Sequence, residues 1–276
     1  MTTKQYEFIA KKLRPRELAL FVKWLLRVKR FIYTLPDGKK FFLDPISDFG
    51  LKILKNNNYE TEMTEQVISF LKPGDSFIDL GSNEGYFSIL ASGLVGQTGK
   101  VIAIEPQQRL WEVIVHNSVL NSCANIQLLP FGISSRSGET VMNLYPSLNT
   151  GASSLSSNFN FKISFGAIRK KIYGQQKIYT KTLDELVDTL PKKIKLIKID
   201  IEGFEFEALK GSEQLLKQHV FENLLVEIHP AALSALGQNE AQLIDFITKF
   251  GYRKSIVTDN LLLFKTPDEN TGNKPG

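Results

Sequence analysis

Residues 77–87 have the composition of a ligand-binding turn between a strand and a helix. An apolar run ends at Asp79, and the chain passes through Gly81 and Gly85 before helical spacing resumes. Ligands of open α/β sheets bind beyond the carboxyl ends of the strands, where such a turn lies. A dinucleotide-binding loop would carry a third glycine where this chain has Asn83, so the ligand need not be a phosphate. A purely structural strand–helix turn is the alternative.

Acidic residues accompany that turn. Asp79 and Glu84 would repel an anion, whereas a cationic sulfonium with an α-amino group suits an acidic loop. Glu105 ends the next apolar strand, about 20 residues after the glycines, where an ionised carboxylate accepts hydrogen bonds from both hydroxyls of a ribose. The two motifs together predict a site for a nucleoside-containing ligand.

Two later strand ends carry a second group of charged residues. Lys198, Asp200 and Glu202 alternate with isoleucines along one predicted strand. Glu227 and His229 share a face at the end of the following strand. Burying such charges is costly unless they are paired or functional, so this group is either part of a site or a structural ion-pair network. Strand adjacency predicts that His229 lies beside Asp200.

Alternating strand and helix patterns must position these residues. The predicted strands are Ser76–Leu80, Val101–Glu105, Ile126–Pro130, Ile194–Ile201, Asn223–His229, Tyr252–Val257 and Leu261–Lys265. The predicted helices are Thr61–Leu71, Tyr86–Gly93, Gln107–Asn121, Glu205–Gln218 and Glu240–Phe250. Strands separated by helices form a parallel sheet, and the short connection between the last two makes them an antiparallel pair at one edge. The expected fold class is therefore α/β, a doubly wound and mostly parallel sheet.

The first 33 residues are strongly basic. They carry nine Lys or Arg against two Glu, a surplus larger than the net charge of +5 of the whole chain. Apolar spacing over residues 5–31 predicts two short helices interrupted at Pro15, and a hairpin follows from Phe31–Leu35 and Lys40–Leu43. The basic segment is either a solvated helical face or a surface for peripheral membrane contact or partner docking.

The chain divides into residues 1–50 (basic helices and hairpin), residues 51–266 (the main domain, with an insertion at 134–182) and a disordered polar tail, residues 267–276. The insertion holds a predicted strand (Thr140–Tyr145), a Ser/Asn/Gly-rich stretch (Gly151–Asn160) and a basic patch (Arg169–Lys171). A long insertion in a compact domain is often a lid.

Composition excludes several classes of protein. The single cysteine, Cys123, cannot form an internal disulfide, and one cysteine and three histidines without ligand spacing exclude a zinc cluster. There is no apolar run of membrane-spanning length and no secretory signal pattern. These features predict a soluble cytoplasmic protein and leave its oligomeric state open.

The motifs resemble those of the FkbM family of S-adenosylmethionine-dependent methyltransferases. The matching stretches are Asp79–Gly85, Glu105-Pro106, Thr182–Asp184, Ile197–Gly203, Leu209–Gly211 and Val226–His229. The likeness spans residues 40–265, and its most discriminating part is the Lys-Ile-Asp-Ile-Glu-Gly block that begins at Lys198. One departure is Ser82, where the family commonly has alanine, another small residue.

The resemblance implies a Rossmann-like class I methyltransferase that methylates a hydroxyl, typically on a sugar or secondary metabolite. Its cofactor, S-adenosyl-L-methionine, would be bound by Asp79, Gly81, Ser82, Asn83, Gly85 and Glu105. An alcohol needs a base as the C–O bond forms, and Asp200 is the first candidate, with His229 second. Some related sugar methyltransferases use a divalent metal instead, and Asp200, Glu202 and Glu227 are oxygen ligands for Mg²⁺.

Two other functions remain as alternatives. A nucleic-acid methyltransferase fits the pI of about 9.1, but the basic excess is confined to the N-terminus and the Asp/Asn-Pro-Pro-aromatic signature of amine methylation is missing. A non-catalytic S-adenosylmethionine-binding scaffold is disfavoured because the motifs at both the cofactor and the base positions are intact. The predicted partner is thus a small-molecule or glycoside acceptor.

Overall fold

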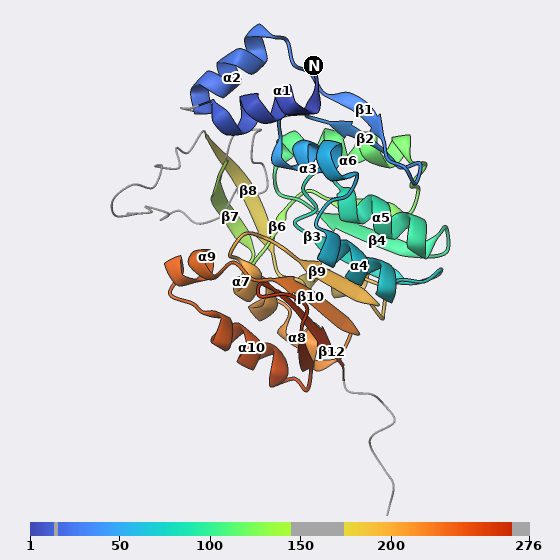
Figure 1. Cartoon of the computed structure of the whole chain (residues 1–276). Coiled ribbons are helices and arrows are strands. Elements are labelled where there is room, and N and C mark those ends of the chain that lie inside the picture. Colours follow the sequence, from blue (N-terminus) through green and yellow to red (C-terminus); the bar gives the residue numbers. More distant parts are fainter. Residues whose placement is uncertain (14–15, 145–173, 267–276) are drawn as a thin grey trace, which may run out of the picture.

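The computed structural model describes residues 1–13, 16–144 and 174–266 (Figure 1). Its centre is a seven-stranded sheet in the order β11-β12-β10-β9-β3-β4-β5. These strands are β3 (Ser76–Leu80), β4 (Lys100–Ile104), β5 (Ile126–Leu129), β9 (Leu196–Ile199), β10 (Asn223–Glu227), β11 (Arg253–Ile256) and β12 (Leu261–Lys265). Five neighbouring strands of this sheet run parallel, namely β5, β4, β3, β9 and β10. The strand β12 pairs antiparallel with both β10 and β11. The predicted doubly wound sheet with an antiparallel edge is confirmed.

The sheet has a hydrophobic core on each face because successive strand residues point to opposite sides. In β3, Phe77 belongs to the core that includes residues of α4 (Thr61–Phe70) and α5 (Tyr86–Val95). Its neighbour Ile78 belongs to the core with α7 (Glu205–Lys210), α8 (Glu213–Lys217) and α10 (Glu240–Thr248). A parallel sheet covered on both faces explains why its strands read as nearly continuous apolar runs.

The hairpin of β1 (Phe31–Thr34) and β2 (Lys40–Leu43) shares a core with the sheet. Phe41 of β2 stacks on Tyr86 of α5 with 5.5 Å between ring centroids. Next to the hairpin, α6 (Gln108–Leu120) packs on β2 and β5. A helix not predicted from the sequence, α3 (Asp48–Asn56), contributes to the same core and contains residue 50, the proposed boundary. The division of the chain at residue 50 stays a prediction.

The N-terminal segment forms α1 (Thr3–Glu7), a π-helical turn η1 (Phe8–Lys12) and α2 (Arg16–Leu25). They surround a small apolar cluster that includes Ile9, Ala19 and Ile46. Lys23 of α2 forms an ion pair with the buried Asp44, which attaches the helix to the segment before α3. In the described part of the chain, no helix is both long and apolar enough to cross a membrane.

The described ends of the insertion form a second sheet in the order β6-β8-β7. Its strands are β6 (Gly132–Ile133), β7 (Gly138–Asn143) and β8 (Gln175–Lys181). The predicted strand Thr140–Tyr145 corresponds to β7, whereas β8 was not predicted. The Ser/Asn/Gly-rich stretch, the basic patch and the tail lie outside the described residues, so the lid and the disordered tail stay predictions.

One predicted helix is divided in the structure. Glu205–Gln218 forms α7 and α8, separated at Gly211. A Cβ at Gly211 would lie 2.1 Å from the carbonyl oxygen of Ser134, so this glycine permits close contact with the chain after β6. Two short elements without strong periodicity, the 3₁₀ helix η3 (Asp184–Thr189) and α9 (Pro230–Ala235), were also not predicted.

Candidate active site

A cleft of about 1070 Å³, including its open mouth, lies at the carboxyl ends of the central parallel strands. Residues that follow β3, β4, β9 and β10 line it together. The lining residues from the sequence motifs include Gly81, Asn83, Glu105, Asp200, Glu202, Glu227 and His229. The motifs converge because neighbouring parallel strands end at the same edge of the sheet.

The glycine turn brings the end of β3 against the loop after β9. Gly81 has a φ of +76°, and a Cβ there would lie 2.0 Å from the carbonyl oxygen of Asp200. A side chain at this position would therefore displace the Asp200 backbone. Gly85 also has a positive φ, +87°, where α5 begins. The spacing of the two glycines thus serves close backbone approach and a sharp entry into the helix.

Three of the six predicted cofactor residues line the cleft, and three do not. Gly81, Asn83 and Glu105 form part of the wall, whereas Asp79, Ser82 and Gly85 lie outside it. Asp79 is fully buried, with Oδ1 3.1 Å from Lys198 Nζ and Oδ2 accepting a hydrogen bond of 2.7 Å from the Ser88 hydroxyl. Asp79 therefore supports the turn from within the core.

Glu84, the other acidic residue of the turn, is also buried. Burial raises the pKa of its carboxyl group, and an ion pair with Arg30 counteracts that shift. The expectation that Glu84 would make the turn attractive to a cation is wrong, because Arg30 compensates its charge. The N-terminal segment thus contributes directly to the support of the turn.

Glu105 follows β4 and is 2% exposed. Its Oε2 accepts the backbone N–H of Asn83 at 2.8 Å, and its Oε1 accepts that of Gln107 at 2.9 Å. Burial raises the pKa of Glu105 to about 7, although both hydrogen bonds oppose the shift. Each carboxylate oxygen retains a further lone pair, which is what two ribose hydroxyls would require.

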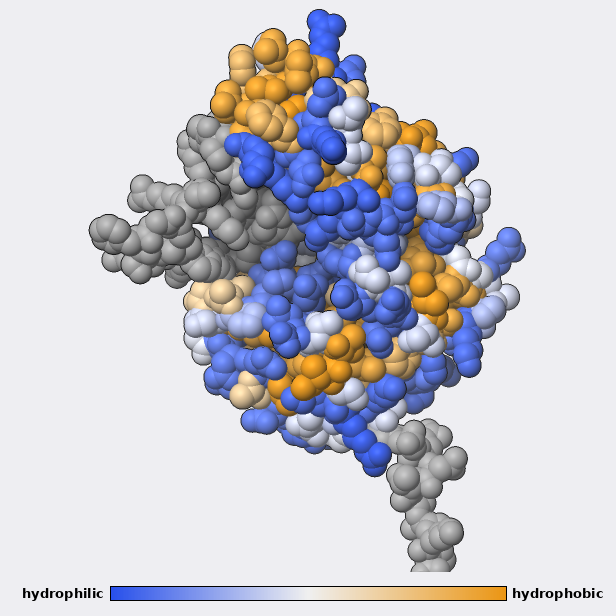
Figure 2. All heavy atoms as spheres, viewed as in Figure 1, coloured by the Kyte–Doolittle hydropathy of each residue, from blue (hydrophilic) through white to orange (hydrophobic). Residues whose placement is uncertain are grey.

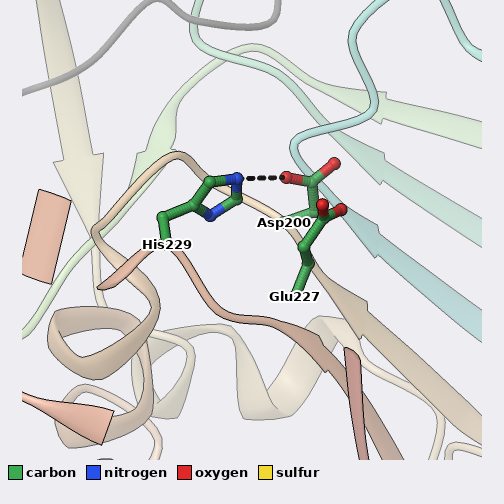
Figure 3. A group of neighbouring side chains, drawn as sticks. All are labelled: Asp200, Glu227 and His229. Atoms are coloured by element: carbon green, nitrogen blue, oxygen red, sulfur yellow. Dashed lines mark ion pairs between the residues drawn. The ribbon is translucent and has the colours of Figure 1, made fainter. Parts of the chain in front are cut away.

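Three side chains at the ends of β9 and β10 point toward one another (Figure 3): Asp200 just after β9, Glu227 at the end of β10 and His229 in the loop that follows. His229 Nε2 lies 3.8 Å from Asp200 Oδ1 and 3.7 Å from Glu202 Oε2. His229 therefore lies beside Asp200, as strand adjacency predicted. Burial together with the charge of Asp200 raises the pKa of Glu202 to about 8 and that of Glu227 to about 7.

Glu205 orients His229 and was not identified from the sequence. Its Oε1 lies 2.9 Å from His229 Nδ1 and also accepts the Gly203 N–H at 2.9 Å. Burial opposes protonation of the imidazole, but the hydrogen bond and charge of Glu205, with Asp200 and Glu202, raise the pKa of His229 to about 10. The raised pKa favours the imidazolium form of His229 at neutral pH and so disfavours it as the base, and its place as the second candidate stays a prediction.

Lys198 links the glycine turn to Asp200. Its ammonium group lies 3.1 Å from Asp79 Oδ1 and 3.3 Å from Asp200 Oδ2, and it donates to the Gly81 carbonyl at 3.1 Å. Burial disfavours the charged amine, but the two carboxylates keep its pKa above the ordinary value. Lys198 thus forms the buried ion-pair network that was the alternative reading of this motif, while Asp200 and Glu202 face the cleft.

The group of side chains that could hold a metal ion differs from the predicted set by one residue, with His229 in place of Glu202. One donor atom each from Asp200, Glu227 and His229 lie within 4.8 Å of one another, and Glu202 is not in this group. Two carboxylates with an imidazole suit Mn²⁺, Fe²⁺ or Zn²⁺ better than Mg²⁺, which prefers oxygen ligands. A metal would also have to displace the proton of His229. Binding of Mg²⁺ stays a prediction.

Another wall of the cleft comes from α3 and the loop that follows it. Asp48, Lys52 and Glu60 line it, with Lys52 Nζ 2.9 Å from Asp48 and 3.6 Å from Glu60. Sequence reasoning missed these residues because they belong to no motif. The signal available was Ser47, whose hydroxyl accepts the Gly50 N–H and caps α3 ahead of its amphipathic turns.

We expect the thermal midpoint of the ligand-free protein to fall by roughly 3 °C or more between about pH 5.5 and 9. Glu105, Glu202 and Glu227 have folded pKa values above 4.5, and His229 has one above 6.5, so the folded state binds more protons than the unfolded chain. The stabilisation that the three carboxyl groups give the folded state is lost as pH rises from 4.5 through their folded pKa values of about 7 to 8. The contribution of His229 is lost as pH rises from 6.5 toward 10.

Scanning calorimetry across this range tests the expectation. Glu202→Gln removes one titrating group and should flatten the curve. Glu222→Gln, a surface carboxylate paired with Lys195, should leave it unchanged. A midpoint that stays constant or rises with pH would contradict the assigned charge states.

Comparison with known proteins connects the fold and the cleft to a family. Residues 79–254 match the family model described as "Methyltransferase FkbM domain". The chain is 30% identical over 164 residues to Methyltransferase sdnD of Sordaria araneosa, covering 51% of this chain and 62% of that protein. It is 28% identical over 204 residues to Hexuronic acid methyltransferase AglP of Haloferax volcanii, covering 72% of this chain and 75% of that protein.

Among solved structures, a precorrin-6y C5,15-methyltransferase from Geobacter metallireducens GS-15 matches with a TM-score of 0.44 and 14% identity, over 77% of this chain and 92% of that one. The family match is the stronger finding. Its limits include Glu105, Asp200 and His229, whereas the wall of the cleft that α3 forms lies before residue 79. The chain therefore belongs to the methyltransferase family defined by the FkbM domain.

Proposed function

We propose that this chain transfers the methyl group of S-adenosyl-L-methionine to a hydroxyl of a sugar or secondary metabolite. The observation that carries the proposal is one cleft that contains both Glu105 and the pair Asp200–His229. The carboxylate of Glu105 is suited to hold two hydroxyls of the donor. Asp200 lies in the same cleft, where a second hydroxyl-bearing molecule would need a base.

The charge of the wall fits a cationic methyl donor. Among the described lining residues are six acidic side chains and two basic ones; the acids are Asp48, Glu60, Glu105, Asp200, Glu202 and Glu227, and the bases are Lys52 and His229. Partial protonation of Glu105, Glu202 and Glu227 at neutral pH, where their pKa values are about 7 to 8, reduces the acidic excess without cancelling it. Bound S-adenosylmethionine supplies a methyl group on a positively charged sulfur. An excess of negative charge around the cleft stabilises such a ligand and disfavours a polyanion such as nucleic acid.

Asp200 is the proposed base. The acceptor oxygen forms a bond to the methyl carbon while the C–S bond breaks and its electron pair stays on sulfur. The hydroxyl proton passes to the Asp200 carboxylate as this happens. Lys198, 3.3 Å from Oδ2, holds the carboxylate in place. His229, which is protonated, donates from Nε2 and orients the acceptor, since in-line displacement depends mainly on alignment.

The same residues define the metal-dependent alternative. Asp200, Glu227 and His229 would hold a divalent ion, which would lower the pKa of the acceptor hydroxyl. Removal of the ion with EDTA would then abolish methyl transfer, and its return would restore it.

The charges of the cleft wall also favour one class of acceptor over another. The name of AglP describes a hexuronic acid methyltransferase, so glycosides are the first class to test. Lys52 is already paired with two carboxylates, which leaves little positive charge for a uronate. We therefore favour a neutral hydroxyl compound, and matched glucoside and glucuronide acceptors distinguish the two.

Calorimetric titration with S-adenosylhomocysteine tests cofactor binding, and a labelled-methyl transfer screen over glycosides and metabolite alcohols tests the reaction. Binding together with transfer to a hydroxyl supports the proposal. Binding without transfer to any acceptor would favour the scaffold alternative, and transfer to RNA or DNA alone would favour the nucleic-acid alternative. Absence of binding would overturn the proposed function.

A further inference from the structure

Helix α2 is apolar on the face that points away from the protein. Its packed side includes Ala19, which is fully buried with Ile9 and Ile46. At 3.6 residues per turn, its other face presents Leu18, Phe21, Trp24 and Leu25, whose exposed fractions are 41%, 54%, 72% and 60%. A surface helix of a soluble protein normally carries polar residues there. These four side chains are the exposed face of α2.

Neighbouring features enlarge this surface. Leu26, directly after the helix, is 51% exposed. The rings of Phe21 and Trp24 contact each other with centroids 5.9 Å apart. Figure 2 shows hydrophobic residues gathered over α2, bordered by hydrophilic ones. Exposed apolar groups gathered in this way, with a tryptophan among them, mark an interaction surface.

Basic side chains accompany the exposed face of α2. Lys12 precedes the helix, and Arg27 and Lys29 follow it; all three are exposed. Within the described residues, none of the three forms an ion pair with a carboxylate. Lys23 and Arg30, in contrast, are bound to Asp44 and Glu84 and support the domain. The segment from residue 12 to residue 29 therefore carries both exposed apolar and exposed positively charged side chains.

We propose that α2 and its flanking basic residues dock the protein on an anionic lipid bilayer. Apolar side chains with a tryptophan enter the interfacial region of a bilayer, and Lys and Arg beside them contact anionic headgroups. A second copy of this chain is a poorer occupant. A symmetric contact through this face would bring two segments together that each carry nine Lys or Arg against two Glu.

The N-terminal helices connect the proposed membrane-docking face to the cleft. α1 packs against α3, and α3 supplies Asp48, Phe49 and Lys52 to the wall of the cleft. A protein held by α2 would therefore be attached through the N-terminal segment that packs against one wall of its cleft. This inference does not depend on the reaction catalysed.

Vesicle flotation of the full chain tests the proposal directly. We expect it to bind vesicles with about 30% phosphatidylglycerol in phosphatidylcholine and to bind pure phosphatidylcholine vesicles much less. Binding should weaken in about 0.5 M salt, because salt screens the headgroup charge. In a Trp111→Phe background, Trp24 is the single tryptophan, and its emission should shift to shorter wavelength on binding.

Two sets of variants separate the contribution of the basic side chains to vesicle binding from that of the apolar face. Each basic residue contributes about fivefold to partitioning, so Lys12→Gln, Arg27→Gln and Lys29→Gln together should weaken binding about 100-fold. Lys217→Gln, Arg253→Gln and Lys254→Gln, exposed residues elsewhere, form the matched control and should bind normally. Trp24→Ser should also weaken binding, whereas Val119→Ser, at a position 73% exposed on α6, should not.

Thermal unfolding and S-adenosylhomocysteine titration of each variant confirm that the fold and the cleft are intact. Equal loss of binding in the control set would overturn the proposal, as would failure of the folded parent chain to float with anionic vesicles. Self-association that Trp24→Ser abolishes, without vesicle binding, would assign the exposed face of α2 to a dimer instead.

Discussion

Asp200→Asn is expected to lower methyl transfer by about 100-fold or more, the usual contribution of a general base. The amide has the size of the carboxylate but cannot take a proton from the acceptor hydroxyl. Cofactor binding should be nearly unchanged, because Gly81, Asn83 and Glu105 keep their positions. The fold should also persist, since Lys198 retains its pairing with Asp79. Turnover and S-adenosylhomocysteine affinity, measured on the same preparation, check both halves of this expectation.

Three comparisons sharpen the result. Asp259→Asn, the same change at an exposed position between β11 and β12, should leave turnover unaltered. His229→Ala should cost about tenfold, less than a base, because the imidazolium only orients the acceptor. EDTA should have no effect on the base mechanism and should abolish activity in the metal-dependent one. If activity survives both Asp200→Asn and EDTA, neither mechanism holds, and the catalytic group must be sought in residues 134–182.

Glu105→Ala is expected to weaken cofactor binding by about 1.5–3 kcal/mol, which is roughly 10- to 150-fold. The substitution removes a charged acceptor and leaves the N–H groups of Asn83 and Gln107 without their partner. Glu105→Gln keeps one acceptor oxygen and should lie between the parent and the alanine variant. Glu112→Ala, an exposed glutamate on α6, is the matched control and should bind normally. Calorimetry with S-adenosylhomocysteine provides the affinities.

The raised pKa of Glu105 adds a pH signature to this prediction. Only the ionised carboxylate accepts both hydroxyls well, so affinity should fall as pH drops through about 7. A single group titrating there weakens binding about tenfold between pH 8 and pH 6. Glu105→Gln should remove that dependence. An unchanged pH profile in the variant, or normal affinity in Glu105→Ala, would show that the ribose site lies elsewhere.

Much of the fold was predictable because its signals are local. Apolar runs bounded by turn residues located β3 and β12 at their observed limits, Ser76–Leu80 and Leu261–Lys265. The convergence of Glu105, Asp200 and His229 was also predictable, since parallel strands end at one edge of the sheet. Elements outside the motifs were missed, among them β8 and the amphipathic helix α3, although α3 forms part of the cleft wall.

The sequence by itself determined that Glu105, Asp200 and His229 meet at one edge of the sheet, because the ends of parallel strands can be located from patterns within short segments. The tertiary structure alone decided their charge states and their supports. Glu84 is neutralised by Arg30, 54 residues away, and Asp79 is paired with Lys198, 119 residues away. His229 is protonated because the buried Glu205 contacts its ring. These interactions depend on burial and on distances in space, and neither of these can be read from how far apart two residues are along the chain.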